Sequence, residues 1–386
     1  MNPYHRLGVR TLINASGTMS YLGGSIMPPD VVAAWVEASK YFVHMDELLA
    51  AASREIARLT GAEAGLITAG ADAGLSLAAA SCIAGTVPDR YHQLPDTTGL
   101  KNEVVIPKVC AQIHDRSYAV SGARLIFVGT ENGFTADDVE RAVGERTAAA
   151  VFVYFANTNK GDEALDVMLR TAHRHGLPLI LDAAAETPPR ENIRKFITMG
   201  ADVVAFSGGK DIQGPNDTGI LYGRKDLIDG ATVQMRVLPP FGIGRSMKVG
   251  REDVVATVCA LDRYMSMDFD AHLAAWERRA QSFIRAFGEH PGVSCTIHRP
   301  NAEKHEYTAQ CPCRVVITLD ERALGVTAET LAQRLYDGEP RIVLGGGGGQ
   351  ISVNPHCLID GEEEIIARRL REELGGPAHV HPRSAP

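Results

Sequence analysis

The sequence predicts an α/β protein with a large domain, built on a mostly parallel sheet of seven strands, and a smaller C-terminal α+β domain. Short apolar runs alternate with longer periodic segments between about residues 60 and 225, which is typical of a parallel sheet covered by helices. Runs such as 149–154 are apolar at nearly every position, as strands buried on both faces are. With 386 residues, 45% of them hydrophobic, the chain exceeds one ordinary domain and can bury two cores.

The elements of the large domain follow from these runs in chain order. The expected strands are 65–68, 103–106, 124–128, 149–154, 177–181, 202–206 and 219–222. The expected helices between them are 71–84, 135–143, 163–175 and 190–199.

The C-terminal third has a different pattern. An amphipathic stretch over 253–290, without a glycine before Gly288, predicts a linking helix. Beyond it we expect strand, helix, strand and helix at 314–319, 327–336, 350–353 and 362–374. The predicted division is an N-terminal segment that packs on the domains (1–45), a large domain (46–252), a linking helix with the small domain (253–374) and a disordered tail (375–386).

Composition excludes several classes of protein. The formal charge of −8 offers no basic surplus for a nucleic acid. The seven cysteines are scattered and contain no CxxC pair, which disfavours a disulfide framework and a structural zinc site, so no metal is predicted. No apolar run reaches the roughly 18 residues of a membrane span. We therefore expect a cytoplasmic protein that acts on a small molecule.

A lysine lies directly after one of the expected strands. The strand 202–206 runs into Ser207, Gly208 and Gly209, and then Lys210. Glycines let a ligand approach the backbone closely, and strand ends in an open α/β sheet are where ligands bind. A partly desolvated amine there can have a lowered pKa and attack an aldehyde. Taken alone, Lys210 is equally compatible with a surface lysine in a glycine-rich turn.

A carboxylate ends a second apolar strand. Asp182 follows 177–181 and precedes Lys210 by 28 residues. A buried aspartate needs a cationic partner, and a protonated pyridine nitrogen is one. By itself Asp182 could also cap the next segment or hold a metal, but together with Lys210 it makes a more specific pair.

The third feature is a turn of small residues, Thr68-Ala-Gly-Ala-Asp-Ala-Gly74, which opens an alanine-rich helix. Unpaired amides at a helix start suit a phosphate, although this turn alone is a weak signal. It lacks the glycine patterns of dinucleotide folds and P-loops. An amine for an aldehyde, a carboxylate for a ring nitrogen and a helix start for a phosphate together describe pyridoxal 5′-phosphate (PLP).

These motifs resemble those of the SelA-like group of PLP enzymes, which contains selenocysteine synthase and D-glucosaminate-6-phosphate ammonia lyase. The resemblance covers about residues 7–265 and extends more thinly to 374. The stretches that carry it are Ile13-Asn-Ala-Ser-Gly-Thr18 with Leu22-Gly-Gly-Ser25, Leu59-Thr-Gly-Ala-Glu-Ala-Gly65, Leu94-Pro-Asp-Thr-Thr-Gly-Leu-Lys-Asn-Glu103, Leu181-Asp-Ala-Ala-Ala-Glu186, Phe206-Ser-Gly-Gly-Lys210 with Gly214-Pro215, and Gly244-Arg-Ser-Met-Lys248. The resemblance implies PLP fold type I, which is aspartate aminotransferase-like, and a cofactor-binding large domain.

The resemblance also implies roles for individual residues. Lys210 would form the Schiff base, and Asp182 would pair with the pyridine nitrogen. The cofactor phosphate would be held by Ala69, Gly70, Ala71 and Ser207. His114 lies where these enzymes place an aromatic ring over the cofactor, and it could also shuttle a proton. The alternative is a histidine on a helix surface.

Candidate substrate contacts are basic. Arg245 and Lys248 belong to a glycine-punctuated loop that could approach a neighbouring subunit's cofactor phosphate or the substrate anion, unless it is simply a solvated loop. Gly244 of the same loop is a candidate cofactor contact. Arg341 is a candidate for the substrate carboxylate, because a guanidinium binds carboxylates bidentately.

The implied reaction is an α,β-elimination on an amino acid or amino-sugar acid, giving ammonia and a 2-oxo acid. A racemase or epimerase, an aminotransferase and, less favoured, a transferase on aminoacyl-tRNA are the alternatives, the last disfavoured by the acidic total and the lack of a long N-terminal RNA-binding extension. The resemblance also implies a homodimer or a higher symmetric oligomer.

Two departures from the family pattern stand out. Asp211 places an acid next to the lysine, with Asn216 after the proline, which suggests a different substrate charge. Gly345–Gly349 contains five glycines in succession and predicts a mobile lid or flexible hairpin, with disorder as the competing interpretation.

Overall fold

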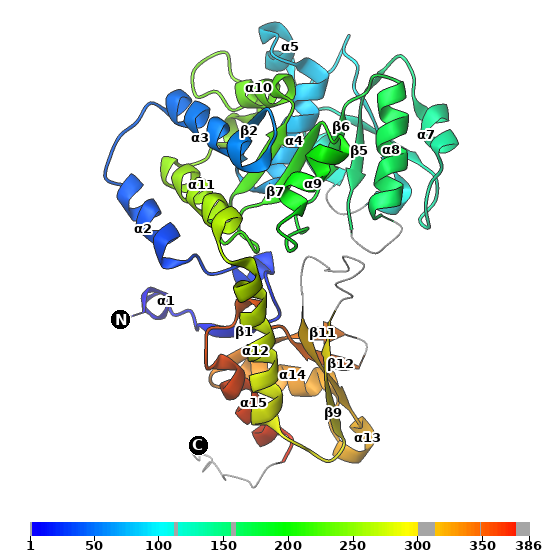
Figure 1. Cartoon of the computed structure of the whole chain (residues 1–386). Helices are drawn as coiled ribbons and strands as arrows, with labels where there is room; N and C mark the ends of the chain where they lie inside the picture. The colour runs from blue at the N-terminus through cyan, green and yellow to red at the C-terminus, as the bar shows by residue number, and fades with distance from the viewer. Residues whose placement is uncertain (1, 112–114, 156–159, 300–312, 348, 376–386) are drawn as a thin grey trace. The chain divides into compact units, whose positions relative to one another are not determined.

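The computed structural model describes residues 2–111, 115–155, 160–299, 313–347 and 349–375 (Figure 1). These residues form two compact units: Ser25–Met267 is the large unit, and residues 2–24, 268–299 and 313–375 are the small unit. The ends of the units at 24 and 267 therefore differ from the predicted domain boundaries at 45 and 252. Among the described residues, no helix is long and apolar enough to cross a membrane.

The large unit is built on a seven-stranded sheet with the order β2-β8-β7-β6-β5-β3-β4. All seven expected strands are present: β2 (Ala64–Thr68), β3 (Glu103–Pro107), β4 (Arg124–Val128), β5 (Thr147–Val153), β6 (Leu179–Asp182), β7 (Val203–Ser207) and β8 (Gly219–Gly223). Neighbouring strands are parallel except at β8, which is antiparallel to both β2 and β7. The predicted fold class is confirmed.

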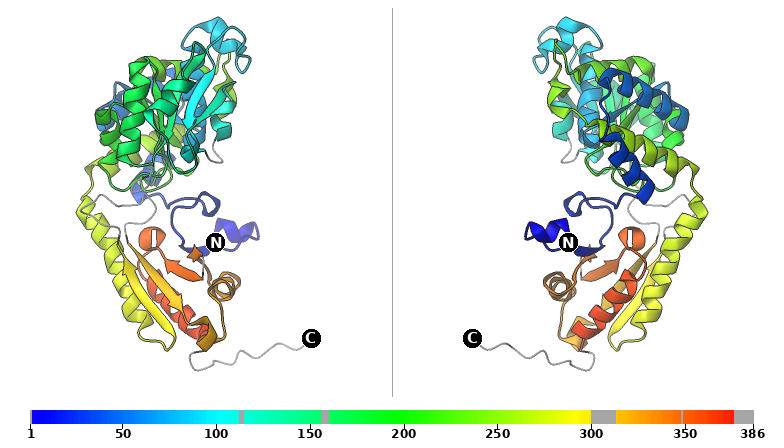
Figure 2. Two further views of the ribbon diagram at one scale, coloured as in Figure 1. Left: turned by 90° about the vertical axis from the view of Figure 1, so that its right-hand side faces the viewer. Right: turned by 90° about the vertical axis from the view of Figure 1, so that its left-hand side faces the viewer.

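Helices cover both faces of this sheet, as Figure 2 shows. Every residue of β2, β5, β6 and β8 is buried, in agreement with their apolar composition. The helices of the unit are α2 (Pro29–Ala38), α3 (Met45–Thr60), α4 (Gly70–Ala84), α5 (Pro88–Gln93), α6 (Asp115–Ala119), α7 (Ala136–Ala142), α8 (Asp162–Arg174), α9 (Asn192–Met199), α10 (Lys225–Gln234) and α11 (Arg251–Ser266). The four expected helices correspond to α4, α7, α8 and α9.

Helix α4 is buried along nearly its whole length. Its small residues let it approach β7 and β8 on one side and α10 on the other. Its N-terminus is thereby fixed at the edge of the sheet where β2 ends.

The small unit contains a five-stranded sheet with the order β1-β11-β12-β10-β9. Its strands are β1 (Leu12–Ala15), β9 (Val293–His298), β10 (Arg314–Leu319), β11 (Arg341–Gly347) and β12 (Gln350–Val353). Helices α12 (Phe269–Phe287), α14 (Ala328–Asp337) and α15 (Glu362–Glu373) cover it, and α1 (Pro3–Arg6) and α13 (Glu321–Leu324) are short. The core is centred on Trp276, Phe283 and Phe287 of α12.

The structure corrects one expected element and shows part of the glycine run. The single linking helix is two helices, because Met267 has extended backbone and Asp268 caps α12 by accepting a hydrogen bond from the Ala271 amide (2.9 Å). Gly345–Gly347 pair with β12 in an antiparallel hairpin. Gly348 lies outside the described residues.

Candidate active site

Three chain turns meet at one edge of the large sheet. Because β2 and β7 are both antiparallel to β8, they run in the same direction and end at the same edge. In the sheet register Gly219, the first residue of β8, lies between Thr68 and Ser207, the last residues of β2 and β7. Asp182 ends β6 at this edge, next to Ala205 of β7. The topology therefore brings the predicted lysine turn, the carboxylate and the helix start together.

The turn into α4 depends on close backbone contact. Gly70 has a φ of +82°, a conformation that favours glycine. A Cβ at Gly219 would lie 2.4 Å from the Gly70 carbonyl carbon and 2.6 Å from the Ala71 nitrogen. Thr68 Oγ1 donates a hydrogen bond to the Gly70 carbonyl (2.8 Å). Ala69 is exposed and Gly70 and Ala71 are half-buried, so the turn is accessible to an anion.

The turn that carries Lys210 is equally constrained. A Cβ at Gly208 would lie 2.2 Å from Thr218 Oγ1, and a Cβ at Gly209 would lie 2.4 Å from Asn216 Cα. The Gly208 amide donates to the Thr218 carbonyl (2.8 Å), and the Gly214 amide donates to the Gly208 carbonyl (2.8 Å). The lysine therefore extends from a backbone that is fixed at both ends of the turn.

Lys210 is half-buried and faces two carboxylates. Burial lowers the pKa of Lys210, and the negative charges of Asp182 and then Glu186 oppose this lowering. Asp182 is 6% exposed, and its Oδ1 accepts a hydrogen bond from the Ala184 amide (3.0 Å). An amine with a lowered pKa beside a buried carboxylate is the arrangement that the sequence predicts for Lys210 and Asp182.

The comparison with known proteins assigns the family. A family model described as SelA, L-seryl-tRNA selenium transferase, matches residues 12–270. The chain belongs to the SelA family. This membership confirms the resemblance drawn from the sequence motifs.

Relatives within the SelA family cover nearly the whole chain. A 5′-C-glycyluridine monooxygenase-decarboxylase from a Streptomyces species is 32% identical, over 96% of this chain and 92% of that protein. A D-glucosaminate-6-phosphate ammonia lyase from Salmonella typhimurium is 31% identical, over 96% of this chain and 97% of that protein. The solved structure of a D-glucosaminate-6-phosphate ammonia-lyase superposes with a TM-score of 0.84 at 31% identity, covering 97% of this chain and 99% of that chain. The protein is an enzyme of the SelA family.

The remaining predicted site residues are distributed differently. Ser207 is half-buried at the end of β7, at the common edge. His114 lies outside the described residues. Arg341 belongs to the small unit, where its Nε donates to the Tyr336 carbonyl (3.1 Å) and its guanidinium stacks on the Tyr336 ring. Arg341 thus has contacts within its own unit, and its role toward a substrate stays a prediction.

The basic loop 242–248 is anchored to α4 through Gly244. Gly244 is buried, and a Cβ there would lie 2.6 Å from Leu77 of α4. The Arg245 guanidinium lies 6.0 Å from the centre of the Phe241 ring. Lys248 lines a separate cavity with residues of α3 and α10.

Two acids near Lys210 were not understood from the sequence. Asp211 is fully buried and accepts a hydrogen bond from the Tyr264 hydroxyl (2.6 Å), so it has a partner within the protein, and the altered substrate charge stays a prediction. Glu186 is 3% exposed and was not predicted as a site residue. The available signal was its place in the Leu181–Glu186 motif, four residues after the strand-ending Asp182.

Proposed function

We propose that this protein is a PLP-dependent lyase that removes ammonia from an amino acid or amino-sugar acid and leaves a 2-oxo acid. The observation that carries the proposal is the half-buried Lys210 amine beside the buried carboxylate of Asp182. Similarity to a protein named D-glucosaminate-6-phosphate ammonia lyase, in sequence and in structure, supports the reaction class.

The residues at the common edge fit PLP. The close contact of Gly219 with Gly70 and Ala71 leaves the first amides of α4 as a narrow cradle for a phosphate, with the Ser207 hydroxyl across one strand. Asp182 offers a buried acceptor for a protonated ring nitrogen, and Lys210 offers an amine for an aldehyde. When bound, the cofactor supplies that aldehyde and a ring that withdraws electrons from the substrate's α-carbon.

The protein's own groups then have distinct tasks. The backbone amides of Ala69, Gly70 and Ala71 bind the phosphate, and Asp182 keeps the ring nitrogen protonated. With the cofactor and substrate bound, the Lys210 amine would take the proton from the α-carbon. It would then give that proton to a hydroxyl on the β-carbon, which leaves as water. Hydrolysis of the released enamine would then give the 2-oxo acid and ammonia. Arg245 and Arg341 remain candidates for binding the substrate's anionic groups.

Covalent trapping tests the cofactor part of this proposal. We expect reduction with borohydride in the presence of PLP, followed by peptide mapping, to find a pyridoxyl group on Lys210, and Lys210→Ala to remove both the adduct and at least about 1000-fold of the turnover. Lys225→Ala, which changes an exposed lysine of the same unit, is the matched control and should keep both. An adduct on another lysine would contradict the proposal.

Product analysis tests the reaction. The similarity to a monooxygenase-decarboxylase at nearly the same identity makes oxygen-dependent loss of carbon dioxide the second candidate. Amino acids and amino-sugar acids are therefore assayed in air and without oxygen. Ammonia and a 2-oxo acid formed equally in both conditions support the lyase. Release of carbon dioxide that depends on oxygen supports the second candidate. Exchange of the α-hydrogen without ammonia supports a racemase. Transfer of the substrate's amino group to the cofactor supports an aminotransferase.

We also propose that the protein forms a homodimer or a larger symmetric oligomer. Large apolar side chains are exposed in two segments of the large unit, 35–43 and 237–241. Phe42 is 95% exposed, and the Arg251 guanidinium lies 5.4 Å from the centre of its ring, next to the Ser39 carbonyl to which Arg251 donates (3.2 Å). A cavity of about 620 Å³ is lined by Val237 of the second segment and by Met45, two residues after the end of the first.

A second copy of the chain fits this face best. Each partner of a specific dimer buries roughly 800 Å², and exposed aromatic side chains such as Tyr41, Phe42 and Phe241 are typical of such interfaces. Light scattering after size exclusion should give a dimer or larger species, and Phe42→Ser should shift it toward monomer. Val120→Ser, which changes a half-exposed valine elsewhere in the unit, should not. A monomeric wild-type protein would overturn this proposal. The cytoplasmic location stays a prediction.

A further inference from the structure

The loop that follows β6 carries a second buried carboxylate toward the lysine turn. Glu186 is 3% exposed and lies four residues after Asp182. This loop is hydrogen-bonded to the end of β7: the Ala183 amide donates to the Ala205 carbonyl (3.0 Å), and the Ser207 amide donates to the Ala184 carbonyl (3.2 Å). The segments that lead to Glu186 and to Lys210 therefore leave the sheet side by side.

The backbone holds Glu186 in one position. Its amide donates to the Ala183 carbonyl (3.0 Å), and its carbonyl accepts from the side chain of Asn192 (2.7 Å). Asn192 is itself 4% exposed and begins α9. These hydrogen bonds fix the backbone from which the Glu186 side chain extends.

The charged and titratable groups around Glu186 come from several elements. Its charge acts on Lys210, together with that of Asp182, and raises the pKa of that amine against the effect of burial. It also acts on Tyr154, whose hydroxyl donates to Asp162 Oδ1 (2.7 Å). Lys195 from α9 is paired with Asp162 (2.6 Å) and donates to the Tyr154 hydroxyl (3.2 Å).

We propose that Glu186 is a positioning residue that acts through Lys210, by stabilising the ammonium form that the lysine takes after it accepts a proton. This inference rests on the proposed function, in which Lys210 moves a proton from the α-carbon to the leaving group. Asp182 is then engaged by the cofactor's ring nitrogen, so Glu186 is the second carboxylate that compensates the ammonium. The proton passes from carbon to Lys210 Nζ and from Nζ to the leaving oxygen, and the lysine ends uncharged.

The charge of Lys210 can be measured without cofactor. Competitive acetylation of the protein without PLP, read by mass spectrometry of the Lys210 peptide between pH 7 and 10, reports the neutral fraction of that amine. In Glu186→Gln the loss of a negative charge should increase the acetylation rate of Lys210 at pH 8 by at least about threefold. The control is Glu103→Gln, which removes a mostly buried carboxylate paired with Arg124 (3.2 Å) at the opposite edge, and it should leave the rate unchanged.

A second pair of variants separates charge from packing. Glu186→Asp and Glu186→Asn shorten the side chain equally and differ only in charge. We therefore expect the acetylation rate of Lys210 in Glu186→Asp to match that of wild type, and the rate in Glu186→Asn to match that of Glu186→Gln. Equal labelling in wild type and in all three Glu186 variants would overturn the inference, as would the same increase in Glu103→Gln. The acetylation assay needs no PLP. Unchanged acetylation rates together with a pyridoxyl adduct on Lys210 would therefore reject only the role of Glu186. A labelling shift without any adduct rejects only the proposed function.

Discussion

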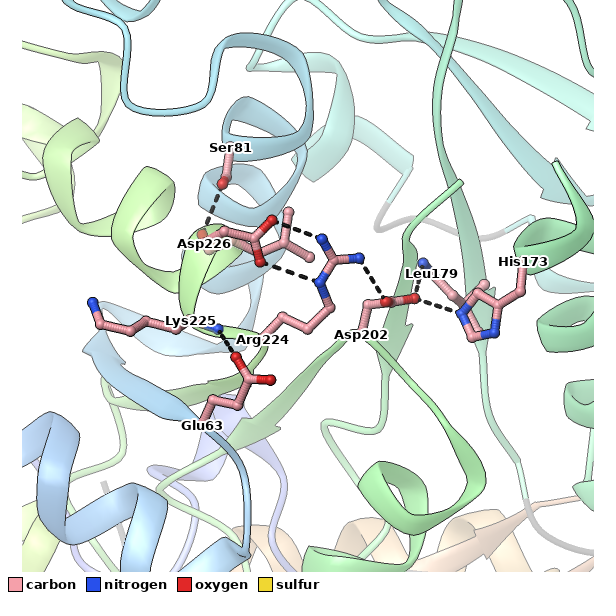
Figure 3. Close-up of polar contacts among 9 residues, drawn as sticks. Glu63, Ser81, His173, Leu179, Asp202, Arg224, Lys225 and Asp226 are labelled. Carbon is pink, nitrogen blue, oxygen red and sulfur yellow. Dashed lines mark hydrogen bonds and ion pairs between the residues drawn. The ribbon is translucent and has the colours of Figure 1, made fainter. Parts of the chain in front are cut away.

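Two cations of the large unit each face two carboxylates, at opposite edges of the same sheet, and they behave in opposite ways. Arg224, which follows β8, donates to Asp202 (3.0 Å) and to Asp226 (2.7 Å), and these hydrogen bonds raise its pKa (Figure 3). Lys210, at the other edge, faces Asp182 and Glu186, yet burial is the larger effect and lowers its pKa. Hydrogen bonds have the larger effect on the pKa of the arginine, and desolvation has the larger effect on the pKa of the lysine.

The difference separates a cluster of stabilising ion pairs from the site at which we propose that the reaction takes place. Asp202 is 7% exposed and accepts hydrogen bonds from His173 Nε2 and the Leu179 amide, both at 2.8 Å, in addition to Arg224. It thereby connects α8, β6, β7 and the end of β8 (Figure 3). Such a carboxylate holds several chain segments together through its hydrogen bonds. A lysine whose positive charge is only partly stabilised by neighbouring carboxylates instead loses its proton more easily and can then react as an amine.

The largest effect is expected from Asp182→Asn at the reactive edge. An amide cannot keep a ring nitrogen protonated, so turnover should fall by at least about 100-fold. The unfolding midpoint in urea should change less than in Asp202→Asn. Steady-state assays and urea titration on the same preparations measure both. Retention of turnover would show that the two edges do not differ in the way that we describe.

Asp202→Asn should have the complementary effect. The variant loses the ion pair with Arg224 and the charge facing His173, and because both partners are half-exposed we expect a loss of about 1–3 kcal/mol in the free energy of unfolding. Acetylation of Lys210 should be unchanged, since Asp202 is at the opposite edge. A change in Lys210 labelling equal to that of Glu186→Gln would break the comparison.

The sequence predicts the reactive edge better than the stabilising one. The positions of Lys210 and Asp182 could be predicted because Asp182 ends one apolar run and Lys210 follows another after Ser207, Gly208 and Gly209. A strand buried on both faces is visible in composition alone. Asp202 precedes its strand, and its partners His173 and Arg224 come from segments that only the fold brings together. Nothing in the order of residues distinguishes the buried Asp211, bonded to Tyr264, from a carboxylate that faces a ligand.

The small unit shows the same limit. β1 was missed because its partner β11 lies 329 residues later in the chain and is rich in glycine. The predicted N-terminal segment 1–45 therefore divides between the two units, and its first part completes the small sheet. Long-range pairing of short strands leaves little trace in local composition.

Gly219→Ala tests the backbone of the reactive edge with a smaller expected effect. The added Cβ would displace Gly70 and Ala71, and we expect the affinity for PLP to fall by about tenfold, measured by titrating the absorbance of the bound cofactor. Gly144→Ala is the matched control, because a Cβ there meets no atom within 4 Å and its φ is not in the left-handed region. Equal affinities in the two variants would show that the α4 turn does not hold the phosphate.

The smallest effect concerns the pH dependence of stability. Burial lowers the pKa of Lys210 below its ordinary value of 10.5, so the ammonium form opposes folding at every pH where both folded and unfolded chains are protonated. Between the folded pKa and 10.5 the unfolded chain binds more protons, and stability is gained as pH rises. Lys210→Met removes the titration. Urea unfolding of the protein without PLP, from pH 8 to 10, should therefore show wild type gaining stability relative to Lys210→Met. The opposite slope would mean that Asp182 and Glu186 outweigh burial, and Lys210 would then resemble Arg224.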